Sequence, residues 1–199
     1  NIRIGTLNLS LDEISHKVVS AQLGSDALSK SIKAGIIGFI IIILFLLLVY
    51  RIAGVAASLA LVVFVELEML TLNAFDLTLS LPGIAGIILG IGMAVDANVI
   101  INARIREEIA AGKTVKSAIT IGFDKAKSAI VDGNITTLIA ALVLLWRGSG
   151  TVQGFAQTLA ISIVFQLFTS LFVSKWFVWI LYYLGFQGEK FYGKEKTRK

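Results

Sequence analysis

The sequence predicts an all-α membrane protein: a bundle of five transmembrane helices with amphipathic helices at the cytoplasmic surface. Apolar residues make up 56% of the 199 residues, mean hydropathy is +0.85, and only 16% of residues are charged. A water-soluble domain of this size cannot bury so much apolar surface, so lipid must solvate most of it. This composition excludes a soluble enzyme, and the lack of cysteine excludes disulfides and thiolate chemistry.

The first 30 residues mix polar and apolar side chains without a long apolar run. They predict a strand and a short helix from the tail of an extracytoplasmic domain. Because the sequence begins with Asn1 and shows no signal-peptide pattern, we expect it to be part of a longer protein. The single histidine, His16, lies here without the companions that a metal site needs.

Residues 31–184 form the expected transmembrane domain, with five apolar runs long enough to span a membrane. A hydrocarbon core of about 30 Å takes about 20 helical residues. We expect the spans at about 34–50, 52–72, 81–101, 130–146 and 155–173. Arg51 ends the first span, and the aromatic cluster "WFVWILYY" (176–183) marks a membrane interface after the last.

The segment 103–128 carries charges of both signs and apolar residues at helical spacing. Gly112 and Thr114 indicate a break and a fresh N-cap. The segment therefore predicts two amphipathic helices at the membrane surface. The tail, 185–199, is basic, and we expect it to be mobile.

Lysine and arginine predict the orientation. With five spans, Arg51, the basic residues of 103–128 and the tail fall on one side of the membrane. The positive-inside rule then places the N-terminal segment outside and the C-terminus in the cytoplasm. The expected location is the cytoplasmic (inner) membrane.

The third span contains "GIILGIGMAVDANVII" (86–101), with the acid Asp96 inside an apolar run. An ionised carboxylate at such a depth costs on the order of 3 kcal/mol. Gly83, Gly86 and Gly90 have the spacing that lets another helix pack closely, so Asp96 should face protein. A proton or ion relay and a structural bond, for example to Asn98 or Asn102, are equally consistent with the sequence.

Other polar residues have structural alternatives. Asp132, Asn134 and Thr137 in the fourth span are suited to capping at least as well as to a relay. The fifth span carries a polar seam, for which packing is favoured over lining a hydrated path; its members are Thr158, Ser162, Gln166 and Thr169.

Two acids in the second span, Glu66 and Glu68, lie on the same side of the membrane as Arg147, which predicts a structural Glu–Arg pair. "GKT" (112–114) and "GIGMAV" (90–95) lack the context of nucleotide-binding motifs. The residues therefore predict no cofactor, no metal site and no nucleic-acid partner.

Two long stretches carry a family resemblance: "LPGIAGIILGIGMAVDANVIINARIREEI" (81–109) and "GFDKAKSAIVDGNITTLIAALVLLWRGSGTVQGFAQTL" (122–159). Together with "QLGSDALSKSIKAG" (22–35), they resemble the C-terminal membrane half of the SecD family of protein-export (translocase) subunits. These subunits belong to the resistance–nodulation–division (RND) superfamily. The resemblance extends from Gln22 to about Trp176.

The resemblance implies a transport function without covalent catalysis. Family members pair with SecF and use a cation gradient, usually protons, to assist export through the SecYEG channel after the SecA motor has begun it. Asp96 matches the acid implicated in conduction, and SecF is expected to supply its partners. The unfolded preprotein would be held by the extracytoplasmic domain, and lipid surrounds the bundle. The alternatives are an RND-type exporter of lipids or small molecules, or a passive membrane scaffold.

Several positions depart from the family pattern. Ala103 stands where an acid is usual, and Gly133 replaces the commoner alanine between Asp132 and Asn134. Glu66 and Glu68 stand where neutral residues are expected, and Arg147 is likewise unexpected. These departures are consistent with a variant member, such as one that uses sodium.

Overall fold

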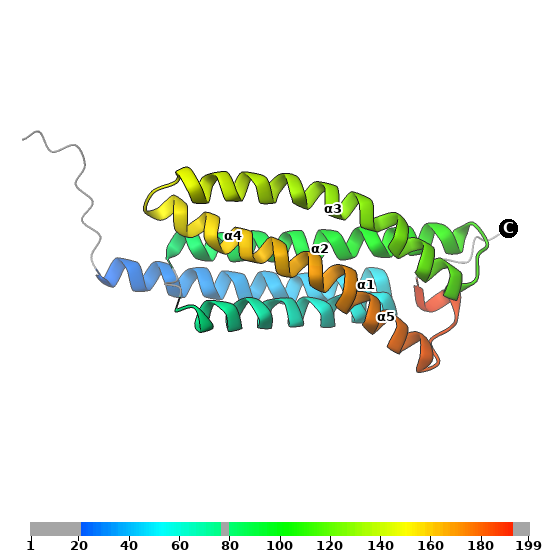
Figure 1. Cartoon of the computed structure of the whole chain (residues 1–199). Helices are drawn as coiled ribbons and strands as arrows, with labels where there is room; N and C mark the ends of the chain where they lie inside the picture. Colours follow the sequence, from blue (N-terminus) through cyan, green and yellow to red (C-terminus); the bar gives the residue numbers. More distant parts are fainter. Residues whose placement is uncertain (1–20, 77–79, 193–199) are drawn as a thin grey trace, which may run out of the picture.

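The computed structural model describes residues 21–76 and 80–192, and these fold into a bundle of long helices (Figure 1). Within the described residues, four helical stretches are long and apolar enough to cross a membrane: Asp26–Ala74, Leu81–Ala110, Val115–Arg147 and Thr151–Tyr183. The elements are α1 (Ala21–Ala74), α2 (Leu81–Ala110), α3 (Val115–Arg147), α4 (Thr151–Phe168), the π-helix η1 (Thr169–Val173), α5 (Ser174–Tyr183) and the 3₁₀-helix η2 (Glu189–Tyr192).

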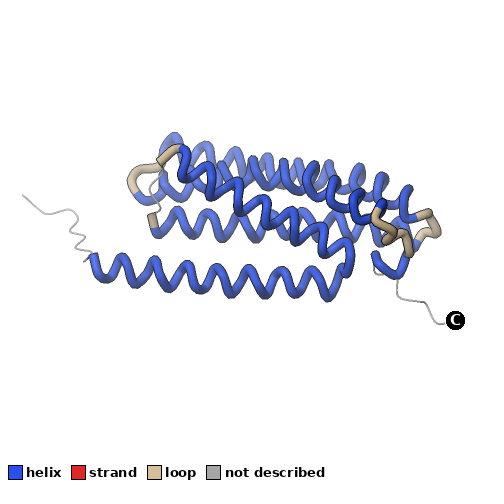
Figure 2. The backbone as a smooth tube through the Cα atoms, turned by 90° about the horizontal axis from the view of Figure 1, so that it is seen from below, coloured by secondary structure: helices blue, strands red, loops and turns tan. Residues whose placement is uncertain are grey.

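Helix α1 is two helical segments joined at Arg51, whose backbone is not helical (φ 52°, ψ −119°). The two halves run side by side in opposite directions (Figures 1 and 2). Gly54 permits this reversal, because a Cβ there would lie 2.0 Å from the carbonyl oxygen of Leu46. The helix also begins at Ala21, well before the expected start at residue 34. Residues 1–20, on which the expected strand falls, lie outside the described part.

Arg106 of α2 stabilises the reversal. The last carbonyl groups of a helix lack partners within the helix. The Arg106 guanidinium donates one hydrogen bond to the carbonyl oxygen of Val49 and lies 4.5 Å from the centre of the Tyr50 ring. Its Nε donates to the carbonyl oxygen of Tyr192 at 3.2 Å. One side chain therefore joins α1, α2 and η2 at this end of the bundle, which we call the Arg51 end.

The C-terminal segment packs on the same end. Arg51 Nη1 donates to the carbonyl oxygen of Lys190 at 2.9 Å, and the Tyr192 side chain is only 1% exposed. Burial raises the pKa of the Tyr192 hydroxyl to about 12. Residues 185–192 thus differ from the expected mobile tail, because two arginines bind their backbone. Residues 193–199 lie outside the described part.

The segment 103–128 does not form separate surface helices. It continues α2 and α3, which meet at a turn where Gly112 has φ 84° and Thr114 caps α3 by accepting a hydrogen bond from Ser117 N at 3.4 Å. Helix α2 has 30 residues and is about 45 Å long, so it exceeds a hydrocarbon core of about 30 Å. The charged segment is therefore the projecting end of two long helices.

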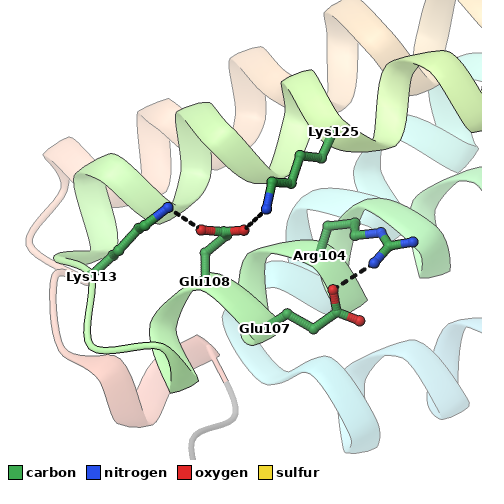
Figure 3. Close-up of polar contacts among 5 residues, drawn as sticks. All are labelled: Arg104, Glu107, Glu108, Lys113 and Lys125. Carbon is green, nitrogen blue, oxygen red and sulfur yellow. Dashed lines mark hydrogen bonds and ion pairs between the residues drawn. The ribbon is translucent and has the colours of Figure 1, made fainter.

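An ion-pair cluster closes this α2–α3 hairpin (Figure 3). The buried carboxylate of Glu108 lies 2.5 Å from Lys113 Nζ and 2.6 Å from Lys125 Nζ. Arg104 and Glu107 form a separate, exposed pair at 2.7 Å. Because Lys113 follows α2 and Lys125 lies on α3, Glu108 ties the turn and the next helix to α2.

Two glycines, Gly86 and Gly90, let α2 pack closely against α4. A Cβ on Gly86 would lie 2.2 Å from Thr158 Oγ1, and one on Gly90 would lie 2.4 Å from the Cβ of Ser162. Gly83 faces the same helix, with a Cβ position 3.5 Å from a methyl group of Thr158. Small residues that bring backbones together are a common means of helix association in membranes.

We expect Gly90→Ala to destabilise the bundle by about 1–3 kcal/mol, the usual cost of overpacking a tight contact. Gly92→Ala is the matched control, since a Cβ at Gly92 meets no atom within 4 Å. The measurement is unfolding of the detergent-solubilised protein by a denaturing detergent. Equal stability of the two variants would contradict the close α2–α4 contact.

We expect Arg106→Lys to destabilise the Arg51 end by about 1–3 kcal/mol, because an ammonium group cannot make the two bonds and the ring contact together. Arg104→Lys, on the exposed i,i+3 pair, should change stability by less than about 0.5 kcal/mol. Limited proteolysis near Arg51 and detergent unfolding measure both. A larger effect at Arg104 would refute the assignment.

Candidate functional site: the polar cavity beside Asp96

A cavity of ≈ 180 Å³ lies between α2, α3 and α4. Four polar side chains contribute to its lining: Asp96, Asn134, Thr137 and Gln166. One water molecule occupies about 30 Å³ in the liquid, so the cavity has room for several. The structure thus brings Asn134 and Thr137 to Asp96 and adds Gln166 from the polar seam.

The polar lining is held by hydrogen bonds to helix backbones. Asn134 Nδ2 donates to the carbonyl oxygen of Ile130 at 2.7 Å, and Thr137 Oγ1 donates to that of Gly133 at 3.2 Å. Gln166 Nε2 crosses from α4 to the carbonyl oxygen of Met93 on α2 at 3.1 Å, while its Oε1 is buried without a partner. An unpaired buried acceptor is costly unless water or a proton donor satisfies it.

Asp96 lines this cavity and is also exposed on the surface of the bundle. Within the described residues, its carboxyl group makes no hydrogen bond and no ion pair. Such a group is available to bind a proton, a cation or a group from another chain. Exposure on a helix that lies among lipid-facing segments is unusual for an acid, since acids within membranes normally face protein or water.

Three other predicted site residues lie away from the cavity lining. Asn98 and Asn102 are buried on another face of α2, where Asn98 Nδ2 donates to the carbonyl oxygen of Ala94 at 2.9 Å. In the described region neither amide forms a hydrogen bond with Asp96. The structural bond between Asp96 and Asn98 or Asn102, which the sequence left open, is therefore not formed. Asp132 is exposed on α3 and accepts a hydrogen bond from Ser128 Oγ at 3.1 Å.

The polar seam lies inside the bundle, with every member 5% exposed or less. Thr158 Oγ1 donates to the carbonyl oxygen of Gly83 at 3.0 Å, and Ser162 and Gln166 also bond to other helices. These bonds between helices are the ones that a packing role requires. The seam continues into η1 at Thr169, a feature that the sequence did not predict. Short π-helical turns are frequent at functional sites.

Glu68 occupies an unexpected position. It is 0% exposed and accepts a hydrogen bond from Ser162 Oγ. Glu66 is exposed, and Arg147 lies over the Trp146 ring at 4.7 Å. The predicted Glu–Arg pair is wrong for the described structure, because Glu68 turns into the bundle toward α4. No sequence signal gives this, since it depends on which face of α1 meets the polar seam.

Comparisons with known proteins place this geometry in a family. Residues 4–183 match the family model described as protein export membrane protein SecD/SecF, C-terminal. The chain is 48% identical over 174 residues to the protein translocase subunit SecD of Syntrophobacter fumaroxidans, covering 87% of this chain and 33% of that protein. It is 45% identical to SecD of Acidaminococcus fermentans, with 87% and 42% covered.

A solved structure has the same fold. The crystal structure of SecDF, a translocon-associated membrane protein from Thermus thermophilus, aligns with a TM-score of 0.79 and 39% identity. The alignment covers 82% of this chain and 23% of that chain. This sequence thus spans less than half the length of the relatives it matches. The family model matches nearly the whole chain, and the chain therefore belongs to the SecD/SecF family of protein-export membrane proteins, whose C-terminal membrane domain it carries.

Proposed function

We propose that this chain is the membrane-integrated part of a protein-export translocase subunit that uses an ion gradient, with protons as the coupling ion. Asp96 is the coupling acid. The observation that carries the proposal is the position of its carboxyl group, unpaired in the described structure, on an apolar helix beside a polar cavity. The export role rests on the relatives, which are named protein translocase subunits SecD.

The proposed topology has five crossings of the cytoplasmic membrane. The reversal at Arg51 supports counting the two halves of α1 separately, since they are about 45 Å and about 34 Å long. Helices α2 and α3 and the stretch Thr151–Tyr183 supply the others. The clustered cations of the Arg51 end support a cytoplasmic position for that end and for the C-terminus.

In the proposed mechanism, Asp96 alternates between a protonated and an ionised form. The polar lining and water in the cavity stabilise the ionised form, and the neutral form is favoured when water is excluded. A gradient does work only if the two protonation states differ in stability between two conformations. The tight α2–α4 contact would transmit such a change along the bundle toward the end at which Ser80 caps α2, which we call the Ser80 end. The expected extracytoplasmic domain would adjoin this end.

The exposed side of Asp96 suits a partner chain. We propose that SecF covers it and supplies the acid and arginine expected from the resemblance. The SecYEG channel and the SecA motor are the further partners, and the unfolded preprotein is the substrate. Contact with that substrate is assigned to the extracytoplasmic domain, most of which lies outside this sequence.

The runner-up is an RND-type exporter of lipids or small molecules. A groove of ≈ 340 Å³ between the halves of α1 and α2 favours it, because its lining is almost entirely apolar. The groove is lined by residues such as Leu28, Ile32, Phe39, Val65, Ile84 and Ile88. The relatives are named protein translocase subunits, which favours the protein-export proposal. A passive scaffold is the third alternative.

We expect Asp96→Asn to abolish the gradient-stimulated part of export while the complex still assembles, because asparagine cannot exchange a proton. The assay follows completion of export in inverted membrane vesicles that contain the full-length protein and SecF, with and without a proton gradient. Asp132→Asn is the matched control, since Asp132 is exposed and outside the cavity.

Unchanged gradient stimulation in the Asp96→Asn vesicles would contradict the proposal and leave Asp96 a structural residue. Stimulation by a sodium gradient in place of protons would reassign the ion. A parallel loss in Asp132→Asn would show that the effect is not specific to Asp96.

A further inference from the structure

Glu68 is a carboxyl group enclosed by the bundle. Its side chain is 0% exposed on the second half of α1, and Ser162 Oγ of α4 is its hydrogen-bond partner. The other carboxyl oxygen, Oε2, is buried without a partner. The mechanism proposed above does not use this group.

Ser162 Oγ lies close to two hydrogen-bond acceptors, and its single hydrogen can be donated to only one of them at a time. Ser162 Oγ lies within hydrogen-bond distance of Glu68 Oε1 and, at 2.9 Å, of the carbonyl oxygen of Thr158. A hydroxyl group has a single hydrogen to donate. If Glu68 is a carboxylic acid, its O–H donates to Ser162 Oγ, the serine hydrogen goes to Thr158, and both contacts are satisfied.

The charges around Glu68 also favour its neutral form. Helix α4 carries no charged residue. The charged side chains of the first half of α1 at this level, Lys30 and Lys33, are exposed, as is Glu66 beside Glu68. Within the described structure no cation forms an ion pair with Glu68. A buried carboxylate without a counter-charge is strongly disfavoured, so these surroundings favour the protonated form of Glu68.

The polar seam connects this acid to Asp96. Ser162 packs against Gly90, and Asp96 lies six residues farther along α2, or about 9 Å along its axis. Gln166, one turn after Ser162, faces the Asp96 cavity, and its unpaired Oε1 is an acceptor. In the other direction the seam reaches Thr158, which lies beside Gly83 in the first turn of α2, close to the N-cap Ser80.

We infer that Glu68 and Ser162 form a second proton-binding site, on the extracytoplasmic side of Asp96, that loads the coupling acid through the polar seam. The inference rests on the proposed function. In each transfer the O–H bond of the Glu68 carboxylic acid breaks and an O–H bond forms on the Asp96 carboxylate. Water molecules carry the proton between them, and net charge is conserved.

Infrared spectroscopy of the full-length protein in lipid tests the protonation directly. At neutral pH, the wild type should show a carboxylic-acid C=O band that Glu68→Gln loses. Glu66→Gln, the exposed neighbour on the same helix, should keep it. A wild-type band that Glu68→Gln leaves unchanged would overturn the inference, because Glu68 would then be ionised.

Export in inverted vesicles with SecF tests the transfer. Glu68→Gln should lose most of the gradient-stimulated export, and Glu66→Gln should retain it. Full stimulation in Glu68→Gln, with loss in Asp96→Asn, would overturn the second site and leave the proposed function intact. Full stimulation in both would refute the proposed function, and the infrared band would still decide whether Glu68 binds a proton.

Ser162→Ala gives an independent test if Glu68→Gln does not accumulate in the membrane. It removes the hydrogen-bond partner of Glu68 and adds no bulk beside Gly90. We expect the carboxylic-acid band to shift, since its hydrogen bond is lost, and gradient-stimulated export to fall. A band at the wild-type position would contradict the Glu68–Ser162 contact.

Discussion

The rest of the structure depends on one constraint: polar groups within a bilayer must find their partners inside the protein. Helix α4 carries polar side chains along one face, and the hydrocarbon core of a bilayer provides no hydrogen-bond partners for them. They bond instead to Gly83, Met93 and Glu68 on α2 and α1. Close approach is required for these bonds, and the glycines of α2 provide it. The seam therefore fixes the position of α2, and with it the position of Asp96.

The Arg51 end follows the opposite principle, because it projects beyond the apolar core and concentrates charge. Arg106 joins the α1 reversal to η2, and Glu108 joins α2 to α3. These contacts fasten the loops on one side of the bundle. A rearrangement around Asp96 would then leave this end of α2 in place and displace the opposite end of the helix, at Ser80.

The sequence was sufficient for the helical class, for the break at Gly112–Thr114 and for the family, because hydropathy, capping and motif signals are local. These local signals identify Asn134 and Thr137 as candidate site residues but do not bring them next to Asp96. The cavity that contains all three arises from the packing of α2, α3 and α4. The sequence did not predict that α1 begins at Ala21 or that α2 and α3 continue through 103–128. Charged residues mark the end of a membrane-spanning segment, but they do not end the helix itself outside the membrane. The sequence also did not predict the burial of Glu68, because that burial depends on which face of α1 packs against α4.

Hydration of the Asp96 cavity is the central claim, and thiol accessibility measures it most directly. The 199 residues contain no cysteine, so single cysteines can be introduced into an otherwise cysteine-free full-length protein. Thr137 lines the cavity, whereas Ile139, two residues away, is itself 58% exposed on the outside of the bundle. With a membrane-impermeant maleimide, the account predicts labelling of Thr137→Cys and not of Ile139→Cys. Absence of labelling at Thr137→Cys, or equal labelling of both, would contradict it.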